Sequence, residues 1–398
     1  MITLIKNEVI KLIYRKKTLV TLIAFILLIG LIGFGLYSQN KANQRNMDPK
    51  QQIINLQYNI DSFNNEINRK GITDADKQMY KDNIVSLEAQ IKSLQDNPIA
   101  TTDWKGYLKD QIQNDEKTLQ DSSTPPSQKG YINKNLFMNK YLLANNIKPE
   151  DQNAFNAVNY IKAIFQLLGM IFLAVGLAIF TSDMVAGEYT PATAKFLLTQ
   201  PVSRSKVLSS KFITAVVSSI LLICFVEIIA FVVVGLISGF GNMNYPVLVG
   251  ERFKLDLSYL NQTGGHDLIA IANTAFIIPM YKFLFEALMM QILFIIACVS
   301  FVFMLSTVVK SSMVAMSISI VTIIAVTILQ NVSTVTRNLA TYTFLIYGNV
   351  PSSLTGEYAS SLQAPHITLA FIIIMLIIWT ILSYVVAHLV FVKRDILI

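Results

Sequence analysis

The sequence predicts an all-α polytopic membrane protein with six transmembrane helices and one large polar insert. Three observations carry this prediction: the composition, a series of long apolar runs, and the distribution of basic residues between those runs. Of the 398 residues, 53% are hydrophobic and only 14% are charged, and the mean hydropathy is +0.50. Because a soluble domain carries roughly 25% charged residues, most of this chain is suited to a lipid environment.

The N-terminal residues 1–17 combine an apolar helical face with several lysines, which predicts an amphipathic helix in the membrane interface. Residues 18–37 are apolar and about as long as the ~20 residues that a bilayer requires. A cleaved signal peptide is the alternative. Its apolar core would span roughly 7–15 residues and precede a small-residue cleavage site, and neither feature fits. We therefore expect a retained first transmembrane helix.

Residues 38–158 form a polar insert with equal numbers of basic and acidic residues. Two apolar seams with alternating spacings of three and four predict two helices of an antiparallel hairpin, joined by turn and N-cap residues at 71–76. A third helix is expected around Leu108–Leu119, a break at Ser122–Ser127, and a last helix near 131–145. The seams predict either packing within a small helical domain or pairing with a second subunit. They comprise Ile53, Leu56, Ile60, Phe63 and Ile67, and Tyr80, Ile84, Leu87, Ile91 and Leu94.

Further apolar runs complete the six expected transmembrane helices. These runs are 160–181, 212–240, 282–308, 312–330 and 367–391.

Basic residues between the runs predict the orientation. They concentrate on alternate segments, whereas the two intervening loops, 241–281 and 331–366, hold only Arg252, Lys254 and Arg337. By the positive-inside rule, both termini face the cytoplasm and the insert 38–158 faces outward. The cytoplasmic segments are then 1–17, 182–211, 309–311 and 392–398.

Both outer loops contain apolar stretches that are too short to span a bilayer. These stretches are 268–280, and 341–347 with 352–361 on either side of Pro351. We expect interfacial or re-entrant segments there, buried in protein or lining a cavity, because irregular backbone is not tolerated in contact with lipid.

The cytoplasmic loop 182–211 is the most distinctive stretch. Thr190-Pro191 predicts a helix start, and Pro201 predicts its end. The helix would cover about 191–199 and measure roughly 14 Å. Phe196-Leu197-Leu198 makes it too apolar to remain in water. It is suited to a cleft in another protein, and the alternative is an ordinary amphipathic helix at the membrane surface.

The residues around this helix resemble the loop between spans two and three of ABC-2-type ABC transporter permeases. They read D-x-x-x-G-E, then F-L-L-T-x-P-V-S-R, then lysine. The basic N-terminus and six spans also resemble this family, and the insert after the first span resembles bacterial permeases of the sodium-export and bacitracin-export type. The resemblance covers the chain except 38–158. Because the insert is larger than in the plainest members, the substrate cannot be carried over.

The resemblance implies that the loop holds a coupling helix that docks on a separate ATP-hydrolysing subunit. It also implies short gate helices at 341–361. The residues implied in docking are Asp183, Gly187, Glu188, Phe196, Leu197, Pro201, Arg204 and Lys206.

Missing motifs shape the remaining expectations. The sequence contains no Gly-Lys pair, which a phosphate-binding P-loop requires, so ATP and magnesium are expected on the partner ATPase and no cofactor on this chain. No spacing of the two cysteines and three histidines suggests a metal site, and no catalytic constellation is evident. The net charge of +7 lies on the short loops of the membrane part, which argues against a nucleic-acid partner.

Two acidic residues lie in or near apolar runs. Glu227 falls within the third run and Glu286 early in the fourth. Because a carboxylate at bilayer depth is costly, such residues usually face protein or a wet cavity. Both are candidates for the translocation path, with cation binding as a further possibility for Glu227. The alternatives are a hydrogen bond between helices for Glu227 and contact with the outer interface for Glu286.

The most consistent functional hypothesis is the permease subunit of an ATP-driven ABC exporter in a bacterial plasma membrane. It would pair with an ABC ATPase and a second permease subunit, as a homodimer or heterodimer, within membrane lipid. The apolar spans favour an amphipathic peptide, antibiotic or lipid-like substrate. The alternative is a mechanotransmitting protein whose outer hairpin regulates an external partner. A membrane enzyme is disfavoured because catalytic residues are lacking.

Overall fold

The computed structural model divides into two compact units. The larger unit comprises Met1–Ile32, Pro125–Tyr131 and Asn156–Ile398, and the smaller unit comprises Gly33–Thr124 and Ile132–Phe155. The residues described are 1–69, 72–96, 103–121, 124, 126–189, 202–256 and 268–393.

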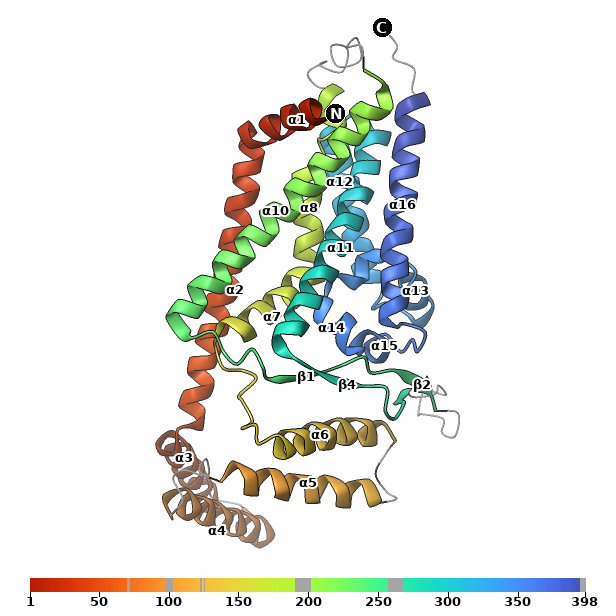
Figure 1. The fold of residues 1–398 in the computed structure, drawn as a ribbon. Helices are drawn as coiled ribbons and strands as arrows, with labels where there is room; N and C mark the ends of the chain where they lie inside the picture. The colour runs from red at the N-terminus through yellow and green to blue at the C-terminus, as the bar shows by residue number, and fades with distance from the viewer. Residues whose placement is uncertain are drawn as a thin grey trace. The chain divides into compact units, whose positions relative to one another are not determined.

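Six helices in the described residues are long and apolar enough to cross a membrane, which confirms the predicted number of spans. The second is interrupted by a π-helical turn, η1 (Leu168–Phe172), between α7 and α8. Figure 1 shows these helices. They are α2 (Lys16–Met47), α7 (Ala157–Leu167) with α8 (Leu173–Thr181), α10 (Arg204–Ser238), α11 (Met280–Val308), α12 (Ser312–Leu329) and α16 (Leu369–Lys393).

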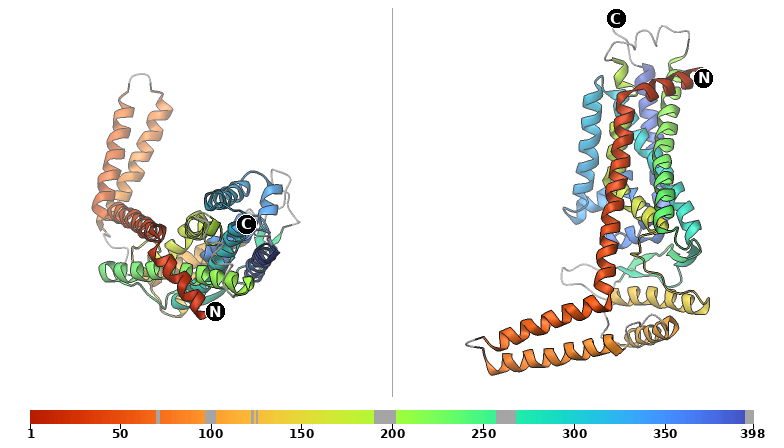
Figure 2. Two further views of the ribbon diagram at one scale, coloured as in Figure 1. Left: turned by 90° about the horizontal axis from the view of Figure 1, so that it is seen from above. Right: turned by 90° about the vertical axis from the view of Figure 1, so that its left-hand side faces the viewer.

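The N-terminal helix α1 (Ile2–Tyr14) ends where Arg15 adopts an extended conformation, and α2 begins directly after it. It lies across the ends of the longer helices of the larger unit (Figures 1 and 2). Leu12 is buried, whereas Ile13 is largely exposed. An apolar side chain left exposed on a helix beside membrane spans suits the expected position in the membrane interface.

The start of α10 and the end of α16 lie at the same end of the helices as α1 (Figure 1). His388 Nε2 and Ser205 Oγ are 3.1 Å apart, and Arg204 Nη1 donates to the carbonyl of Val392 at 3.0 Å. Ser203 is the N-cap residue of α10. The N-terminal helix and the end of the last span therefore lie at one end of the larger unit.

Four short helices follow α12, and the last three fall within 341–361, where gate helices were expected. Two glycines bring this region against the second span. A Cβ on Gly169 of η1 would lie 1.7 Å from the carbonyl oxygen of Gly348, and a Cβ on Gly348 would lie 1.8 Å from that of Gly169. Only glycine allows backbones to approach this closely. The short helices are α13 (Thr334–Ala340), η3 (Phe344–Gly348), α14 (Val350–Thr355) and α15 (Glu357–Ser361).

Two buried tyrosines connect these short helices. The Tyr347 hydroxyl donates to the carbonyl of Thr341, and the Tyr358 hydroxyl accepts from the backbone N–H of Asn349 at 2.9 Å. Burial raises the pKa of both phenols, so both stay protonated across the physiological pH range.

The loop between α10 and α11 corrects the all-α expectation, because it forms two antiparallel ribbons. The stretch 268–280, which we expected to be an interfacial or re-entrant piece, contains two of the strands; its position relative to the membrane stays a prediction. A short apolar run bounded by proline cannot be assigned to a helix or strand by periodicity alone. The pairs are β1 (Pro246–Val249) with β4 (Phe276–Pro279), and β2 (Phe253–Leu255) with β3 (Leu268–Ala270).

The smaller unit is helical in its described residues. Asp48 accepts from the N–H of Lys50 and caps α3, and Thr73 Oγ1 accepts from the N–H of Asp76 at the start of α4. Lys140 pairs with Glu116 at 2.7 Å between α6 and α5. Its helical parts are α2 from Gly33 onward, α3 (Pro49–Ile67), α4 (Asp74–Asp96), α5 (Trp104–Gln120) and most of α6 (Pro126–Ala144).

Helices α3 and α4 form the hairpin that the seams predicted. Phe63 and Tyr80, one from each seam, stack with ring centroids 5.4 Å apart. Ile60 is buried, whereas Tyr58 on the same helix is 75% exposed. The seam therefore packs within this hairpin, and pairing with a second subunit stays a prediction.

Candidate functional site

A cluster of charges, buried except for the half-exposed Lys11, holds the beginning of the 182–211 loop. We call it the anchor cluster, and its members are Glu8, Lys11, Glu188 and Lys211. Lys211, on α10, is only 1% exposed. Its Nζ lies 2.9 Å from both carboxylate oxygens of Glu8 on α1 and 2.7 Å from Oε1 of Glu188. Lys11 Nζ, also on α1, lies 3.1 Å from the same oxygen of Glu188.

The anchor cluster connects three segments that are distant in sequence. Glu188 belongs to the short 3₁₀ turn η2 (Ala186–Tyr189), which follows the second span. The two carboxylates and two ammonium groups of the anchor cluster balance in charge. Because a buried ion is costly without its partner, removing one member of a buried pair destabilises a protein by about 3–5 kcal/mol. Loss of Lys211, Glu8 or Glu188 should therefore weaken the contact between the loop, α1 and α10.

A second set of ion pairs lies beside the anchor cluster. Asp183 Oδ1 is 3.3 Å from Arg15 Nη1 and 3.4 Å from Lys17 Nζ. Lys17 also donates to Ser182 Oγ at 3.3 Å. These contacts tie the loop to the junction of α1 and α2. Because the Asp183 and Arg15 side chains are 19% and 26% exposed, water weakens this pair more than it weakens the anchor cluster.

The loop is also attached to α11. The backbone N–H groups of Val185 and Ala186 both donate to Ser306 Oγ, at 3.1 and 3.0 Å. Ser306 is fully buried near the end of α11. A single hydroxyl thus satisfies two backbone donors that would otherwise be unpaired in the interior. Residues 182–189 are consequently fixed to several helices at once.

The residues expected to dock on a partner fall into two groups. Asp183, Gly187 and Glu188 lie in the anchored part of the loop, where Glu188 is only 6% exposed and its carboxylate is turned into the protein. Arg204 reaches the last turn of α16, and Lys206 is exposed. Phe196, Leu197 and Pro201, with the whole expected helix 191–199, lie outside the described residues.

Sequence reasoning missed that Glu188 pairs with Lys211 on α10 and Lys11 on α1, and that Lys211 also pairs with Glu8 on α1. One signal was available. Glu8 is the sole acidic residue in the basic stretch 1–17. Anionic lipid headgroups would repel an acidic side chain on this basic helix. Such a residue therefore indicates a cationic partner elsewhere in the protein. Its pairing with Lys211 could not be read from the sequence, because the two are separated by the first two spans and the insert.

Glu227, a candidate for the translocation path, is a buried partner of Gln291. Gln291 Nε2 on α11 donates to Glu227 Oε1 at 2.6 Å, and the two residues are 1% and 2% exposed. The second oxygen of Glu227 and the amide oxygen of Gln291 have no hydrogen-bond partner. The geometry matches the helix-to-helix hydrogen bond that was one of the three interpretations of Glu227.

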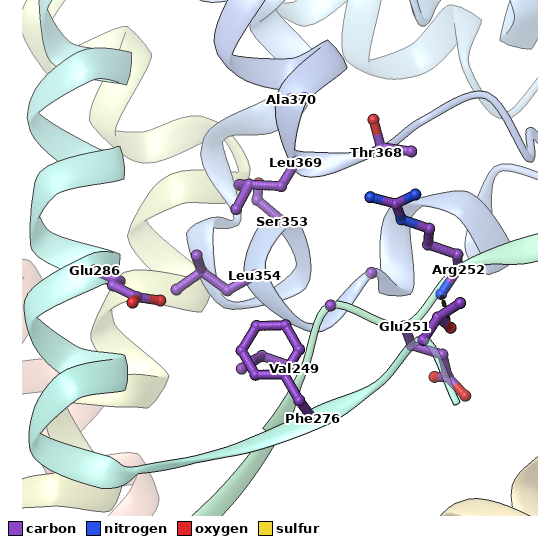
Figure 3. Close-up of a pocket in the computed structure, with 13 residues that line it drawn as sticks. Val249, Glu251, Arg252, Phe276, Glu286, Ser353, Leu354, Thr368, Leu369 and Ala370 are labelled. Carbon is purple, nitrogen blue, oxygen red and sulfur yellow. Dashed lines mark hydrogen bonds between the residues drawn. The ribbon is translucent and has the colours of Figure 1, made fainter. Parts of the chain in front are cut away.

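Glu286, the other candidate, lies in different surroundings. It lines a hollow of about 390 Å³ between the loop after β1, α11, α14 and the start of α16, which we call the ribbon hollow (Figure 3). Its carboxylate is directed into the hollow, and the guanidinium of Arg252 is directed toward Thr368 (Figure 3). Charges of both signs therefore face one open cavity.

The backbone around the ribbon hollow is tightly constrained. Gly250 N–H donates to the carbonyl of Leu354 at 2.8 Å, which ties the ribbon to α14. Gly356 has φ +87°, and a Cβ there would lie 2.1 Å from the carbonyl oxygen of Glu251. Glycine is therefore required at this position on two counts. The hollow is formed by fixed backbone rather than by side chains alone.

Comparison with known proteins gives two matches. The model of a family described as "ABC-2 family transporter protein" matches residues 2–396. The chain is also 27% identical over 295 residues to the uncharacterized protein YhcI of Bacillus subtilis (strain 168), a match that covers 74% of this chain and 84% of YhcI.

Proposed function

The chain belongs to the ABC-2 family of transporter proteins, and on this basis we propose that it is the permease subunit of an ATP-driven exporter. As a family member with six membrane-spanning helices, it is a multi-pass membrane component of a transport system. In our proposal it moves a substrate outward across a bacterial plasma membrane. The energy comes from a separate ABC ATPase, so ATP and magnesium bind there and this chain carries no cofactor.

The observation that carries this proposal is the anchoring of the loop between the second and third spans. The anchor cluster joins Glu188 of the loop to Lys211 of α10 and Glu8 of α1, and Ser306 of α11 holds the adjoining backbone. A force applied to residues 190–201 would therefore be transmitted to several helices at once. This is the mechanical property that a docking loop requires, because interfaces and packed helices move as discrete bodies.

We assign different roles to the residues expected in docking. Phe196, Leu197 and Pro201, with exposed Lys206, contact the ATPase in this proposal. Asp183, Gly187 and Glu188 fasten the loop to its own chain, and Arg204 fastens the start of α10 to α16. The distinction rests on the burial of Glu188 and the internal ion pairs of Asp183.

The proposed orientation places α1 and both termini in the cytoplasm, and the insert 38–158 outside. Two facts support it: basic residues concentrate on the segments at the end of α1, and α1 shares that end of the larger unit with the last turn of α16. A second permease subunit, identical or related, would complete the translocation path. The short helices within 341–361 would act as the outer gate.

The proposed substrate is an amphipathic compound such as a peptide, an antibiotic or a lipid-like molecule. Its support is the apolar character of the spans, which have many exposed large side chains. Phe225 and Leu236 on α10, for example, are 60% and 76% exposed. A compound that partitions into the membrane could enter between such surfaces without crossing water.

A second candidate function is mechanical transmission without transport, in which ATPase strokes move the insert to control an external protein. One observation favours it: α2 is one continuous helix from Lys16 to Met47, and its residues from Gly33 onward belong to the smaller unit. The first span and the insert thus share a single element of secondary structure.

Reconstitution into vesicles tests the two functions. The permease is purified with its proposed ATPase partner, and ATP-dependent movement of a fluorescent amphipathic peptide is measured, with ATP hydrolysis as a parallel readout. The exporter proposal expects transport that is lost in Lys211→Ala and retained when residues 50–120 of the insert are replaced by a short linker. Mechanical transmission is favoured if the ATPase is stimulated, no panel of amphipathic compounds moves, and deletion of the insert abolishes the biological response.

A further inference from the structure

We propose that the ribbon hollow binds the headgroup of a zwitterionic phospholipid, with the phosphate at the start of α16 and the amine at Glu286. The ligand chemistry is a phosphate ester that carries a primary amine and is attached to acyl chains. This inference rests on α11 and α16 being membrane spans and does not depend on the exported substrate.

The phosphate end is formed by a helix start and a guanidinium. Leu369 and Ala370, the first residues of the 25-residue helix α16, line the hollow. Backbone N–H groups at such positions have no acceptor within the helix, and the helix dipole favours an anion there. Thr368 caps only the N–H of Phe371, at 3.3 Å. The Arg252 guanidinium is directed toward this helix start (Figure 3), and arginine binds phosphate strongly.

Ser353 gives an independent indication of a ligand. It lines the hollow, is only 2% exposed, and its hydroxyl has no hydrogen-bond partner. Buried hydroxyls are nearly always hydrogen-bonded, so an unpaired one requires an explanation. A phosphate oxygen in the hollow would supply the missing acceptor.

The amine end is formed by Glu286. Its carboxylate is directed into the hollow from α11 (Figure 3), and its side chain is 36% exposed. Lys282, one turn earlier on the same helix, is 52% exposed and its Nζ lies 3.9 Å away. This separation is too long for a hydrogen bond, so the carboxylate retains acceptor capacity for an ammonium group on the hollow side.

The location and size of the hollow favour a membrane lipid over a soluble compound. The hollow lies where the spans α11 and α16 begin. The ends of membrane spans lie at the level of the polar headgroups of a bilayer. Its volume of about 390 Å³ is at the lower end of the ~300–1,000 Å³ of small-ligand sites. A headgroup fits, and the acyl chains would continue along exposed Phe276 and Phe285.

The test measures lipid binding to the detergent-purified permease by native mass spectrometry. Three probes with distinct chemistry are titrated: short-chain phosphatidylethanolamine, phosphatidylglycerol with the same chains, and glycerophosphoethanolamine, which lacks chains. The variants are Arg252→Gln and Glu286→Gln. The matched control is Lys254→Gln, because Lys254 is an exposed cation on β2 that does not line the hollow.

The proposal expects wild-type protein to bind phosphatidylethanolamine at least about tenfold more tightly than phosphatidylglycerol, a difference of about 1.4 kcal/mol. Arg252→Gln should weaken both lipids about tenfold, Glu286→Gln should remove only the preference for the amine, and Lys254→Gln should change neither. Unchanged binding in Arg252→Gln, or an unchanged preference in Glu286→Gln, would overturn the site. Equal affinity for glycerophosphoethanolamine would overturn the assignment to a lipid.

Discussion

Helix α10 carries two buried ionisable side chains in contrasting surroundings. Lys211, near its start, contacts two carboxylates within 2.9 Å. Glu227, in its middle, has a carboxamide as its hydrogen-bond partner and leaves one oxygen unpaired. The first group is stabilised by opposite charge, and the second is not.

The contrast separates two ways of burying polar groups in one membrane helix. At Lys211 the fold brings carboxylates from α1 and the loop to one ammonium group, and these ion pairs connect three segments. At Glu227 two helices meet through a single hydrogen bond from Gln291, and a hydrogen bond of this kind does not require the carboxyl group to be charged. The anchor cluster should therefore tolerate loss of charge poorly, and the Glu227 site should tolerate it well.

The largest expected effect comes from Lys211→Ala, which leaves Glu8 and Glu188 buried without their cation. We expect a loss of about 3–5 kcal/mol in unfolding free energy, measured as thermal or denaturant unfolding in detergent. The control is Lys206→Ala, which removes an exposed lysine from the same helix and should cost less than about 0.5 kcal/mol. Equal losses in the two variants would contradict the anchoring role of Lys211.

Glu227→Leu should have the next largest effect. The Nε2 group of Gln291 would lose its acceptor inside the protein, and an unsatisfied buried donor costs about 1–3 kcal/mol. Glu227→Gln preserves the shape and the acceptor, and we expect it to change the unfolding free energy by less than about 0.5 kcal/mol. A marked stabilisation by Glu227→Gln would show instead that the native carboxyl is charged.

Asp183→Asn should cost about 1 kcal/mol, because its pairs with Arg15 and Lys17 are partly exposed. Since salt screens exposed charges, this loss of unfolding free energy should shrink when sodium chloride is raised from about 0.05 to about 0.5 M. The Lys211→Ala difference should not shrink in the same series. Salt dependence in both variants would remove the distinction between the two sets of ion pairs.

Glu286→Gln should have the smallest effect on stability, below about 0.5 kcal/mol. Its carboxylate is directed into an open hollow, and its nearest ammonium group is 3.9 Å away. The unfolding free energies of Glu286→Gln and Glu227→Leu should be measured side by side, because the Glu286 carboxylate is open to water and the Glu227 carboxyl group is enclosed. A loss as large as that of Glu227→Leu would mean that Glu286 makes a structural contact.

Local patterns in the sequence predicted the spans and the hairpin because both depend on nearby residues. An apolar run of sufficient length identifies a span wherever it lies, and the seam from Ile53 to Ile67 needs only α4 to pack against. The strand Phe276–Pro279 was missed because four apolar residues fit a strand or a helix equally well. Its partner, Pro246–Val249, lies across a long loop.

The sites were harder to predict because their partners come from distant segments. Glu188 could be selected from the loop pattern, but its burial depends on Lys211 and Glu8, and Glu8 lies 203 residues from Lys211. Gln291 was likewise not recognised as the partner of Glu227. A sequence shows which residues carry charge, and the fold decides which of those charges meet.

Photo-crosslinking at position 196 tests the central proposal, that the loop 182–211 receives movement from an ATPase, most directly. A photoreactive amino acid replaces Phe196 in the permease co-expressed with its ATPase, and the same amino acid replaces Tyr107 of the insert as the control. Our account predicts a covalent adduct with the ATPase from position 196 and none from position 107. An adduct from position 107, or its absence at position 196 in a complex that hydrolyses ATP, would contradict it.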